Sequence, residues 1–347
     1  MTISLCLIIK DEQDVLDRCL SSFCDIVDEI IIVDTGSKDN SINIAKKYTS
    51  KIYNYKWDND FSAARNYSLS FAKCDYIMWV DADDYIENTQ KTKILDLKKS
   101  NDYSIDIYYL LYDFDKNYLP FYRERIIKNN SNCKFKGKIH EAIIPFGKTK
   151  YEKITIKQFD KNKGLTNRNL NIYLSMKQEN LNARDLYYFA KELYRHNEIK
   201  KAKEMFIKSL ETKNGYYIDN IDCCYYLSII YKNENNFKKA LEILFDSFKY
   251  DLPKPHVLCE IGSLYLFNNE IEKAIFYYKL ALNTKIDNNL FVHKDYLKYI
   301  PLIQLCVCYD RLKDYKKAYK YNEMANNIKN NPDIYYHNKK YLSKLIK

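Results

Sequence analysis

Short apolar runs alternate with helix-like segments through the first half of the chain. The runs have the length of strands buried on both faces and lie at residues 3–9, 29–33 and 76–80, with a further candidate strand at 51–55. Between them, apolar residues recur at helical spacing, as in residues 11–23 and 63–72. This alternation predicts an α/β fold with a mostly parallel sheet that helices cover on both faces.

The second half follows a different pattern, a repeat built around one alanine. From about residue 181, four five-residue blocks end at Ala202, Ala240, Ala274 and Ala318. Small residues stand twelve positions before each alanine (Ala190, Ser228, Gly262, Cys306) and seven after it (Ser209, Ser247, Ala281, Ala325). Small residues at fixed offsets allow paired helices to approach closely. The pattern resembles the tetratricopeptide repeat and predicts an all-α solenoid.

We therefore expect two domains, an α/β domain at residues 1–165 and a helical repeat domain at residues 181–347. Charge separates the two halves as well, because residues 1–160 have a net charge of −1 and residues 161–347 have +11. The basic residues of the second half alternate with acids and form no runs. We therefore expect a solvated helix surface and no nucleic acid partner.

Composition bears on where the protein works. No apolar run approaches the roughly 18 residues of a membrane span, and the first residues lack the order of charges of a signal peptide. The ten cysteines contain no CxxC pair, which favours reduced, packed thiols. We expect a cytoplasmic protein without a transmembrane segment.

Carboxylates follow two of the predicted strands. Asp34 comes directly after one apolar run, and Asp81, Asp83 and Asp84 follow another. Ligands of parallel α/β sheets bind beyond the carboxyl ends of the strands. These acids are therefore candidates for one site.

The ordered set of motifs resembles the inverting family 2 glycosyltransferases, which have a Rossmann-like sheet of the GT-A type. The blocks are ISLCLIIKDE from residue 3, EIIIVDTGSKD from 29, DFSAARNY from 60, DYIMWVDADD from 75 and GKIHE from 137. The subgroup with a C-terminal tetratricopeptide tail matches best. The layout is similar to that of the glycocin S-glycosyltransferases, which modify cysteine in bacteriocin precursors.

The resemblance implies a nucleotide-sugar donor held with Mn²⁺ or Mg²⁺. Hard carboxylate ligands suit these ions, which neutralise the charge of a diphosphate leaving group. By the family's motif, Asp83 is a metal ligand and Asp81 contacts the nucleotide or a metal-bound water. His140 is implied as a third metal ligand.

Other residues are implied on the nucleotide side. Asp34 accepts a hydrogen bond from the base in this family, although it can instead be a turn residue bonded by the following backbone. Thr35 and Gly36 suit a tight turn near the nucleotide, and Glu12 lies where the nucleoside packs. Arg65 stands near the nucleotide or the strand-end acids; its alternative is a structural salt bridge to a nearby acid, Asp60 or Asp81.

The sequence leaves open which side chain is the base that removes the acceptor proton. Glu141 is one candidate, its role exchangeable with that of His140, and Asp84 is another. Asp84 has the alternative of capping the next helix. Arg123 and Arg125 either contact the diphosphate or flank the acceptor channel.

These observations predict a metal-dependent inverting glycosyltransferase that uses a nucleotide-sugar, with UDP the commoner nucleotide of the family. A repeat groove beside a transferase domain points to a peptide or protein acceptor. The alternatives are a transferase for a cell-surface polysaccharide or a lipid-linked sugar, and a non-catalytic repeat scaffold. The repeats can also form a homodimer.

Overall fold

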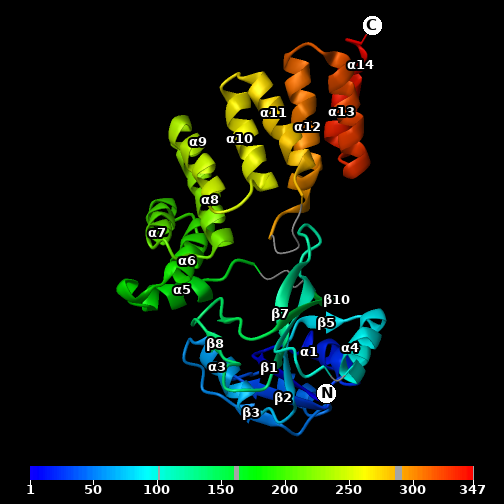
Figure 1. Ribbon diagram of the computed structural model, residues 1–347, viewed down its shortest axis with the longest axis vertical. Coiled ribbons are helices and arrows are strands. Elements are labelled where there is room, and N and C mark those ends of the chain that lie inside the picture. The colour runs from blue at the N-terminus through cyan, green and yellow to red at the C-terminus, as the bar shows by residue number, and fades with distance from the viewer. Residues whose placement is uncertain (101, 160–163, 286–290, 347) are drawn as a thin grey trace. The chain divides into compact units, whose positions relative to one another are not determined.

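The computed structural model describes residues 1–100, 102–159, 164–285 and 291–346 (Figure 1). Two compact units are present, Met1–Ser175 and Met176–Lys347. The first contains the sheet, and the second contains paired helices.

The first unit is built on an eight-stranded sheet with the order β3-β2-β1-β4-β7-β6-β10-β5. Its strands are β1 (Ile3–Ile9), β2 (Glu29–Asp34), β3 (Ile52–Asn54), β4 (Tyr76–Trp79), β5 (Asp84–Ile86), β6 (Ile107–Asp113), β7 (Phe121–Lys128) and β10 (Thr149–Gln158). β3, β2, β1 and β4 run parallel, β6 pairs in parallel with β10, and β7 and β5 are antiparallel to their neighbours. The predicted mostly parallel sheet is confirmed.

Helices cover both faces of this sheet because its strands are apolar on both sides. On one face, Leu5 and Ile32 pack with α1 (Leu16–Phe23) and α4 (Asn88–Ser100). On the other, Ile31 and Trp79 pack with α3 (Phe61–Leu69) and a small ribbon of β8 (Phe135–Lys136) and β9 (Ala142–Ile143). Two short helices complete the unit, α2 (Ser41–Ala45) and α5 (Arg168–Ser175).

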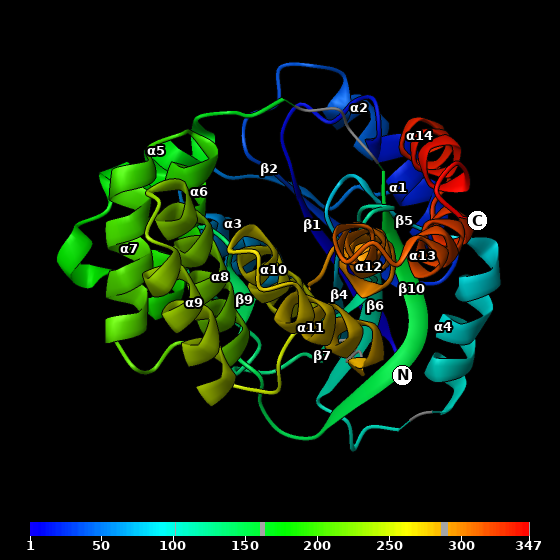
Figure 2. The same ribbon diagram turned by 90° about the horizontal axis from the view of Figure 1, so that it is seen from above.

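The second unit is a solenoid of helix pairs, which Figure 2 shows in succession. The pairs are α6 (Ala183–Arg195) with α7 (Ile199–Glu211), α8 (Tyr217–Asn233) with α9 (Phe237–Asp246), α10 (Pro255–Phe267) with α11 (Ile271–Asn283), and α12 (Tyr299–Arg311) with α13 (Tyr315–Ile328). A further helix, α14 (Pro332–Ser343), packs on α13. We call α6, α8, α10 and α12 the first helices.

The recurring small residues lie where the helices approach most closely. All four alanines that define the repeat have 0% of their surface exposed: Ala202, Ala240, Ala274 and Ala318. Gly262 marks a close approach, because a Cβ there would lie 2.9 Å from the ring of Tyr278 on the partner helix. The register read from the sequence is therefore the register of the packing.

The turn inside each pair repeats as well, which the sequence pattern did not predict. One residue per turn has a positive φ of 59–62°: Asn197, Asn235, Asn269 and Lys313. The next amide donates to the carbonyl five residues back, as Glu198 does to Leu193 and Asp314 to Tyr309. This is the Schellman arrangement, in which a left-handed residue ends the helix. Three repeats use Asn, which tolerates this conformation, and the fourth uses lysine.

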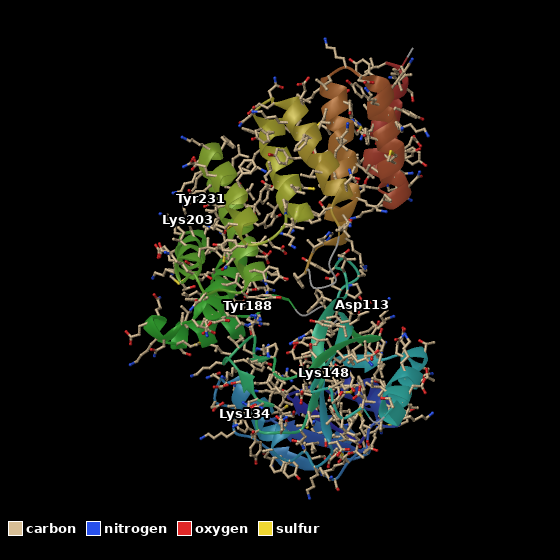
Figure 3. The ribbon with its side chains drawn as sticks, in the orientation of Figure 1. Asp113, Lys134, Lys148, Tyr188, Lys203 and Tyr231 are labelled. Carbon is tan, nitrogen blue, oxygen red and sulfur yellow. The ribbon has the colours of Figure 1, made fainter. Side chains whose placement is uncertain are left out.

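Cation–π contacts occur both between successive pairs and within a pair. The Lys203 ammonium lies 4.4 Å from the centre of the Tyr231 ring, which joins α7 to α8 (Figure 3). Lys273 and Lys317 lie over Tyr265 and Tyr309 in the two later pairs.

Over the described parts of the chain, no helix is long and apolar enough to cross a membrane.

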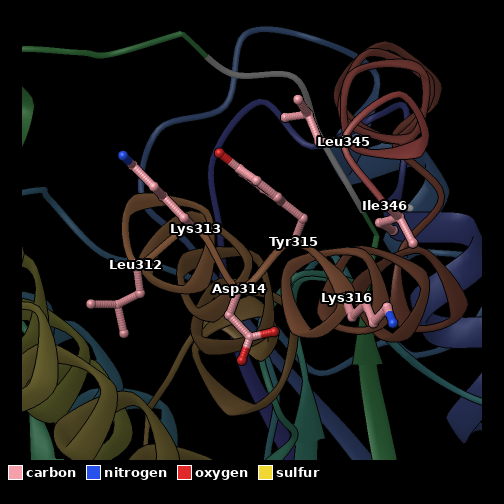
Figure 4. Close-up of a pocket in the computed structure, with 7 residues that line it drawn as sticks. All are labelled: Leu312, Lys313, Asp314, Tyr315, Lys316, Leu345 and Ile346. Atoms are coloured by element: carbon pink, nitrogen blue, oxygen red, sulfur yellow. The ribbon is translucent and has the colours of Figure 1, made fainter.

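We predict that Lys313→Asn stabilises the repeat unit. Lys313 lies at the turn shown in Figure 4, with a φ of 60° and an exposed side chain. Asn adopts this conformation more readily than lysine, so the free energy of unfolding should rise by about 0.5–1 kcal/mol. Urea unfolding measures it. Lys316→Asn, on the exposed side of α13, is the control and should give no gain; an equal gain in both variants would refute the explanation.

Candidate active site at the carboxyl ends of β2 and β4

The candidate site lies where three parallel strands end side by side. β1 pairs with β2 on one side and with β4 on the other, so the segments after these strands share one edge of the sheet. Those segments carry Glu12, Asp34 and the 81–84 acids. The sheet order thus brings together residues that lie up to 72 positions apart in the sequence.

The segments after β1 and β2 are fastened to each other. The Lys38 amide donates to Asp11 Oδ1 at 2.7 Å, and the Asp11 amide donates to Ser37 Oγ at 3.0 Å. The Glu12 amide donates to Ser41 Oγ at 2.7 Å. Asp11 has a φ of 52°, so the chain turns here and α1 begins at Leu16, later than the predicted residue 11. Glu12 is left half-buried beside the loop after β2.

Asp34 is a turn residue in the structure. Its carboxylate accepts hydrogen bonds from the amides of Gly36 at 3.1 Å and Ser37 at 3.1 Å, and it is 4% exposed. Gly36 has a φ of 106°, which explains a glycine at this position. The Thr35 hydroxyl donates to the carbonyl of Ile9 at 3.0 Å and ties the turn to β1. A carboxylate has about four lone-pair sites, so Asp34 retains acceptor capacity for a base.

Asp84 is fully buried and paired. It is the first residue of β5 and no helix cap, and its Oδ2 lies 2.9 Å from Arg125 Nη1 and from the Asp81 amide. Neither side chain of the pair has exposed surface. Burial raises the pKa of Asp84 to about 6, although the charge of Arg125 opposes this. A carboxylate in this position holds the turn in shape and has no exposed surface.

Arg125 is likewise a structural residue, because it also donates to the Trp79 carbonyl at 3.1 Å and stacks on the Trp79 ring. Arg123 and Arg65 lie over the same ring at 4.6 and 4.9 Å from its centre. Of the two interpretations of Arg125, contact with a diphosphate is not compatible with a side chain that has no exposed surface. Trp79 thus organises three arginines, which no pattern in the sequence indicated.

Arg65 connects Asp81 to Glu141. Its Nη2 lies 2.6 Å from Asp81 Oδ1, and its Nε lies 2.5 Å from Glu141 Oε1. Burial acts to lower the pKa of Arg65, but the two carboxylates raise it above its ordinary value. Burial also acts to raise the pKa of Asp81, and the charges of Arg65 and Arg125 hold it at about 2. Asp81 is therefore ionised at neutral pH.

The proposed metal ligands are only partly brought together. Asp83 is half-buried on the same turn as Asp81, while His140 has a φ of 51° and its ring lies 6.5 Å from that of Tyr173. Among the residues that the structure describes, no group of three or more His, Cys, Asp or Glu could hold a metal ion. A cation shared with a diphosphate needs only one or two protein carboxylates, which Asp81 and Asp83 can supply. His140 as a third ligand remains a prediction.

Comparison with known proteins agrees with this geometry. Residues 4–160 match the glycosyl transferase family 2, and residues 255–285 match a tetratricopeptide repeat. The first unit contains a glycosyltransferase domain of family 2.

Three relatives show how far the likeness extends. The chain is 27% identical over 270 residues to the SPbeta prophage-derived glycosyltransferase SunS of Bacillus subtilis, covering 73% of this chain and 64% of that protein. It is 34% identical over 145 residues to a TPR repeat-containing protein of Synechococcus elongatus, covering 41% and 35%. It is 28% identical over 203 residues to the cholesterol galactosyltransferase of Borreliella burgdorferi, covering 55% and 51%. The chain thus spans less than two thirds of each relative.

We predict that the Asp84–Arg125 pair is a structural part of the glycosyltransferase domain. Arg125→Met leaves a buried carboxylate without its cation and should lower the free energy of unfolding by about 3–5 kcal/mol. The double variant Asp84→Asn/Arg125→Met removes both charges and should recover most of this loss. Chemical denaturation of the three proteins measures it. If the double variant were as unstable as Arg125→Met, charge pairing would not be the cause.

Proposed function

We propose that the protein is an inverting glycosyltransferase that moves a sugar from a nucleotide-sugar to a peptide or protein side chain. One observation carries the proposal: acids from the ends of β2 and β4 share one edge of the sheet, and Arg65 joins one of them, Asp81, to Glu141. Such a site has a carboxylate side for the donor and a separate carboxylate for the acceptor. The family 2 match over residues 4–160 supports the same reaction class.

On the donor side, we propose a UDP-sugar held with Mn²⁺ or Mg²⁺. Asp34 would accept a hydrogen bond from the base, with the Thr35–Gly36 turn and Glu12 beside the nucleoside. Asp83, with Asp81, would hold the cation. When bound, that ion neutralises the charge on the departing diphosphate. The depressed pKa of Asp81 keeps its carboxylate available at neutral pH.

On the acceptor side, we propose Glu141 as the general base. The acceptor atom gives its proton to Glu141 and bonds to the anomeric carbon, while the bond from that carbon to the diphosphate oxygen breaks and its electron pair stays on the diphosphate. Glu141 retains 11% of its side-chain surface, whereas Asp84 has none. Exposure therefore favours Glu141 over Asp84 as the base.

The repeat unit supports a peptide acceptor through the face made by its first helices. Side chains link these helices to one another: Tyr187 on α6 donates to Asp222 on α8 at 2.6 Å, and the hydroxyl of Tyr225 on α8 lies 2.8 Å from that of Tyr296, in the segment just before α12. Lys191 lies 5.0 Å from the centre of the Tyr187 ring. Stacked helix pairs present such faces to extended peptides, and tyrosine gives contact area at low entropy cost.

The donor site can be tested through binding. We expect UDP-sugars to raise the melting temperature only with Mn²⁺ or Mg²⁺ present, because a ligand of the native state stabilises it by mass action, by about 2.7 kcal/mol at a concentration 100 times Kd. Asp83→Asn should abolish the metal dependence and the turnover. Asp96→Asn, on the exposed surface of α4, is the control and should keep both. A full metal-dependent shift in Asp83→Asn would exclude it as the ligand.

The acceptor site can be tested with two matched lysines. Lys191→Glu reverses a charge on the first-helix face and should raise KM for a peptide acceptor about tenfold, or about 1.4 kcal/mol, without changing donor hydrolysis. Lys203→Glu, on the second helix α7 and also over a tyrosine ring, should change neither. Mass spectrometry of a peptide library measures the transfer. If the protein transferred sugar only to a polysaccharide or to a lipid-linked sugar, the proposal of a peptide acceptor would be wrong.

A further inference from the structure

Arg65 occupies a position fixed before any ligand arrives. It lies in α3, whose first turn is capped by Asp60 through a hydrogen bond from the Ala63 amide at 2.9 Å. Its guanidinium lies over the rings of Trp79 and Phe135, 4.9 and 5.4 Å from their centres. Arg65 is only 7% exposed. The two rings lie next to each other, 5.3 Å apart between their centres, and packing against them restrains the side chain.

The carboxylates bonded to Arg65 come from different parts of the domain. Asp81 follows β4 on the donor side, and Glu141 precedes β9 on the acceptor side. They take different nitrogens of one planar group, Nη2 and Nε. Because the guanidinium is rigid, it sets the separation and the orientation of the two carboxylates.

The segment that carries Glu141 is fastened to the same helix. The Asn66 side chain donates to the Phe135 carbonyl at 2.9 Å and accepts from the Phe135 amide at 2.8 Å. The Phe61 amide donates to the Lys138 carbonyl at 2.8 Å. Helix α3 thus holds residues 135 and 138 of the segment that leads to Glu141, and Arg65 holds the Glu141 carboxylate.

We propose that Arg65 is a positioning residue that aims the Glu141 carboxylate at the acceptor and sets its distance from Asp81. The proposal rests on the glycosyltransferase function and assigns Arg65 a role through Glu141 in place of direct contact with the donor phosphates. A phosphate could bind these two nitrogens only by displacing a carboxylate from each of them.

The comparison with Arg125 separates this role from a purely structural one. The Arg125–Asp84 pair has no exposed surface on either side chain. In contrast, the partners of Arg65 keep surface, 31% for the Asp81 side chain and 11% for that of Glu141. Arg65 is therefore buried while both its carboxylates remain accessible to ligands, which is the arrangement that a positioning residue requires.

A double-mutant cycle between Arg65 and Glu141 tests the proposal. Arg65→Gln should lower kcat at least about 100-fold, since a small misplacement of a reacting group costs this much, while the donor KM stays nearly unchanged. In the Glu141→Gln background, the same substitution should change kcat by no more than about twofold, because its effect passes through Glu141. Donor hydrolysis and acceptor transfer are measured in parallel. Arg65→Lys keeps the charge and should recover part of the rate in folded protein.

Chemical rescue provides a second readout. Guanidinium ion added to Arg65→Ala can occupy the space between the two carboxylates and should restore part of kcat, which loss of fold would not allow. Arg123→Ala is the matched control: Arg123 lies over the same Trp79 ring, and no ion pair joins it to Asp81 or Glu141 within the described residues. It should show no rescue.

The outcomes distinguish the proposal from the function on which it rests. Turnover by the wild-type protein, with non-additive variants and rescue, supports the role of Arg65. Turnover with additive losses, with no rescue, or with a change confined to the donor KM overturns that role alone. A well-folded wild-type protein that neither hydrolyses nor transfers any nucleotide-sugar overturns the glycosyltransferase function and the role of Arg65 together.

Discussion

The glycosyltransferase domain depends on how it accommodates several carboxylates at one edge of its sheet. The parallel strands β2, β1 and β4 bring acids to this edge, where like charges repel. Two buried arginines offset the charge, Arg65 from α3 and Arg125 from β7, and both pack against Trp79. One pair lies beneath the turn and shapes it, and the other faces the site. The same charge balance therefore holds the turn together and keeps Asp81 ionised for a ligand.

This balance gives neighbouring acids different tasks. Asp81 and Asp84 are three residues apart, yet the pKa of the first falls to about 2 and that of the second rises to about 6. The difference arises from their surroundings, because Asp81 gains more from nearby arginines than it loses on burial, whereas Asp84 does not. An ionised carboxylate at the candidate site and a structural carboxylate are thus made from the same residue type within one motif.

The repeat unit is stabilised by local features that recur in each helix pair. Small residues at constant offsets set the helix approach, and a Schellman turn with one left-handed residue closes each pair. Each pair contacts mainly its neighbours, so the first helices form one regular face. Lys191 and Lys203 both lie over tyrosine rings, but Lys191 is on the first helix of its pair and Lys203 is on the second. The first-helix face is the part of this unit that we connect with an acceptor.

The sequence by itself determined the strand and helix order of the first unit, the repeat register of the second and the set of acids at the strand ends. These follow from periodicity and spacing, which are local properties. Only the tertiary structure decided that Asp84 is buried against Arg125, that Asp34 is held by its own turn, and that Arg65 joins Asp81 to Glu141. Residues 65 and 141 are 76 positions apart and meet because α3 and the segment before β9 pack on the same face of the sheet. Burial and ion pairing depend on such meetings, so the sequence offered the Asp34 turn and an Arg65–Asp81 pair only as alternatives and did not indicate the Arg65–Glu141 and Asp84–Arg125 pairs.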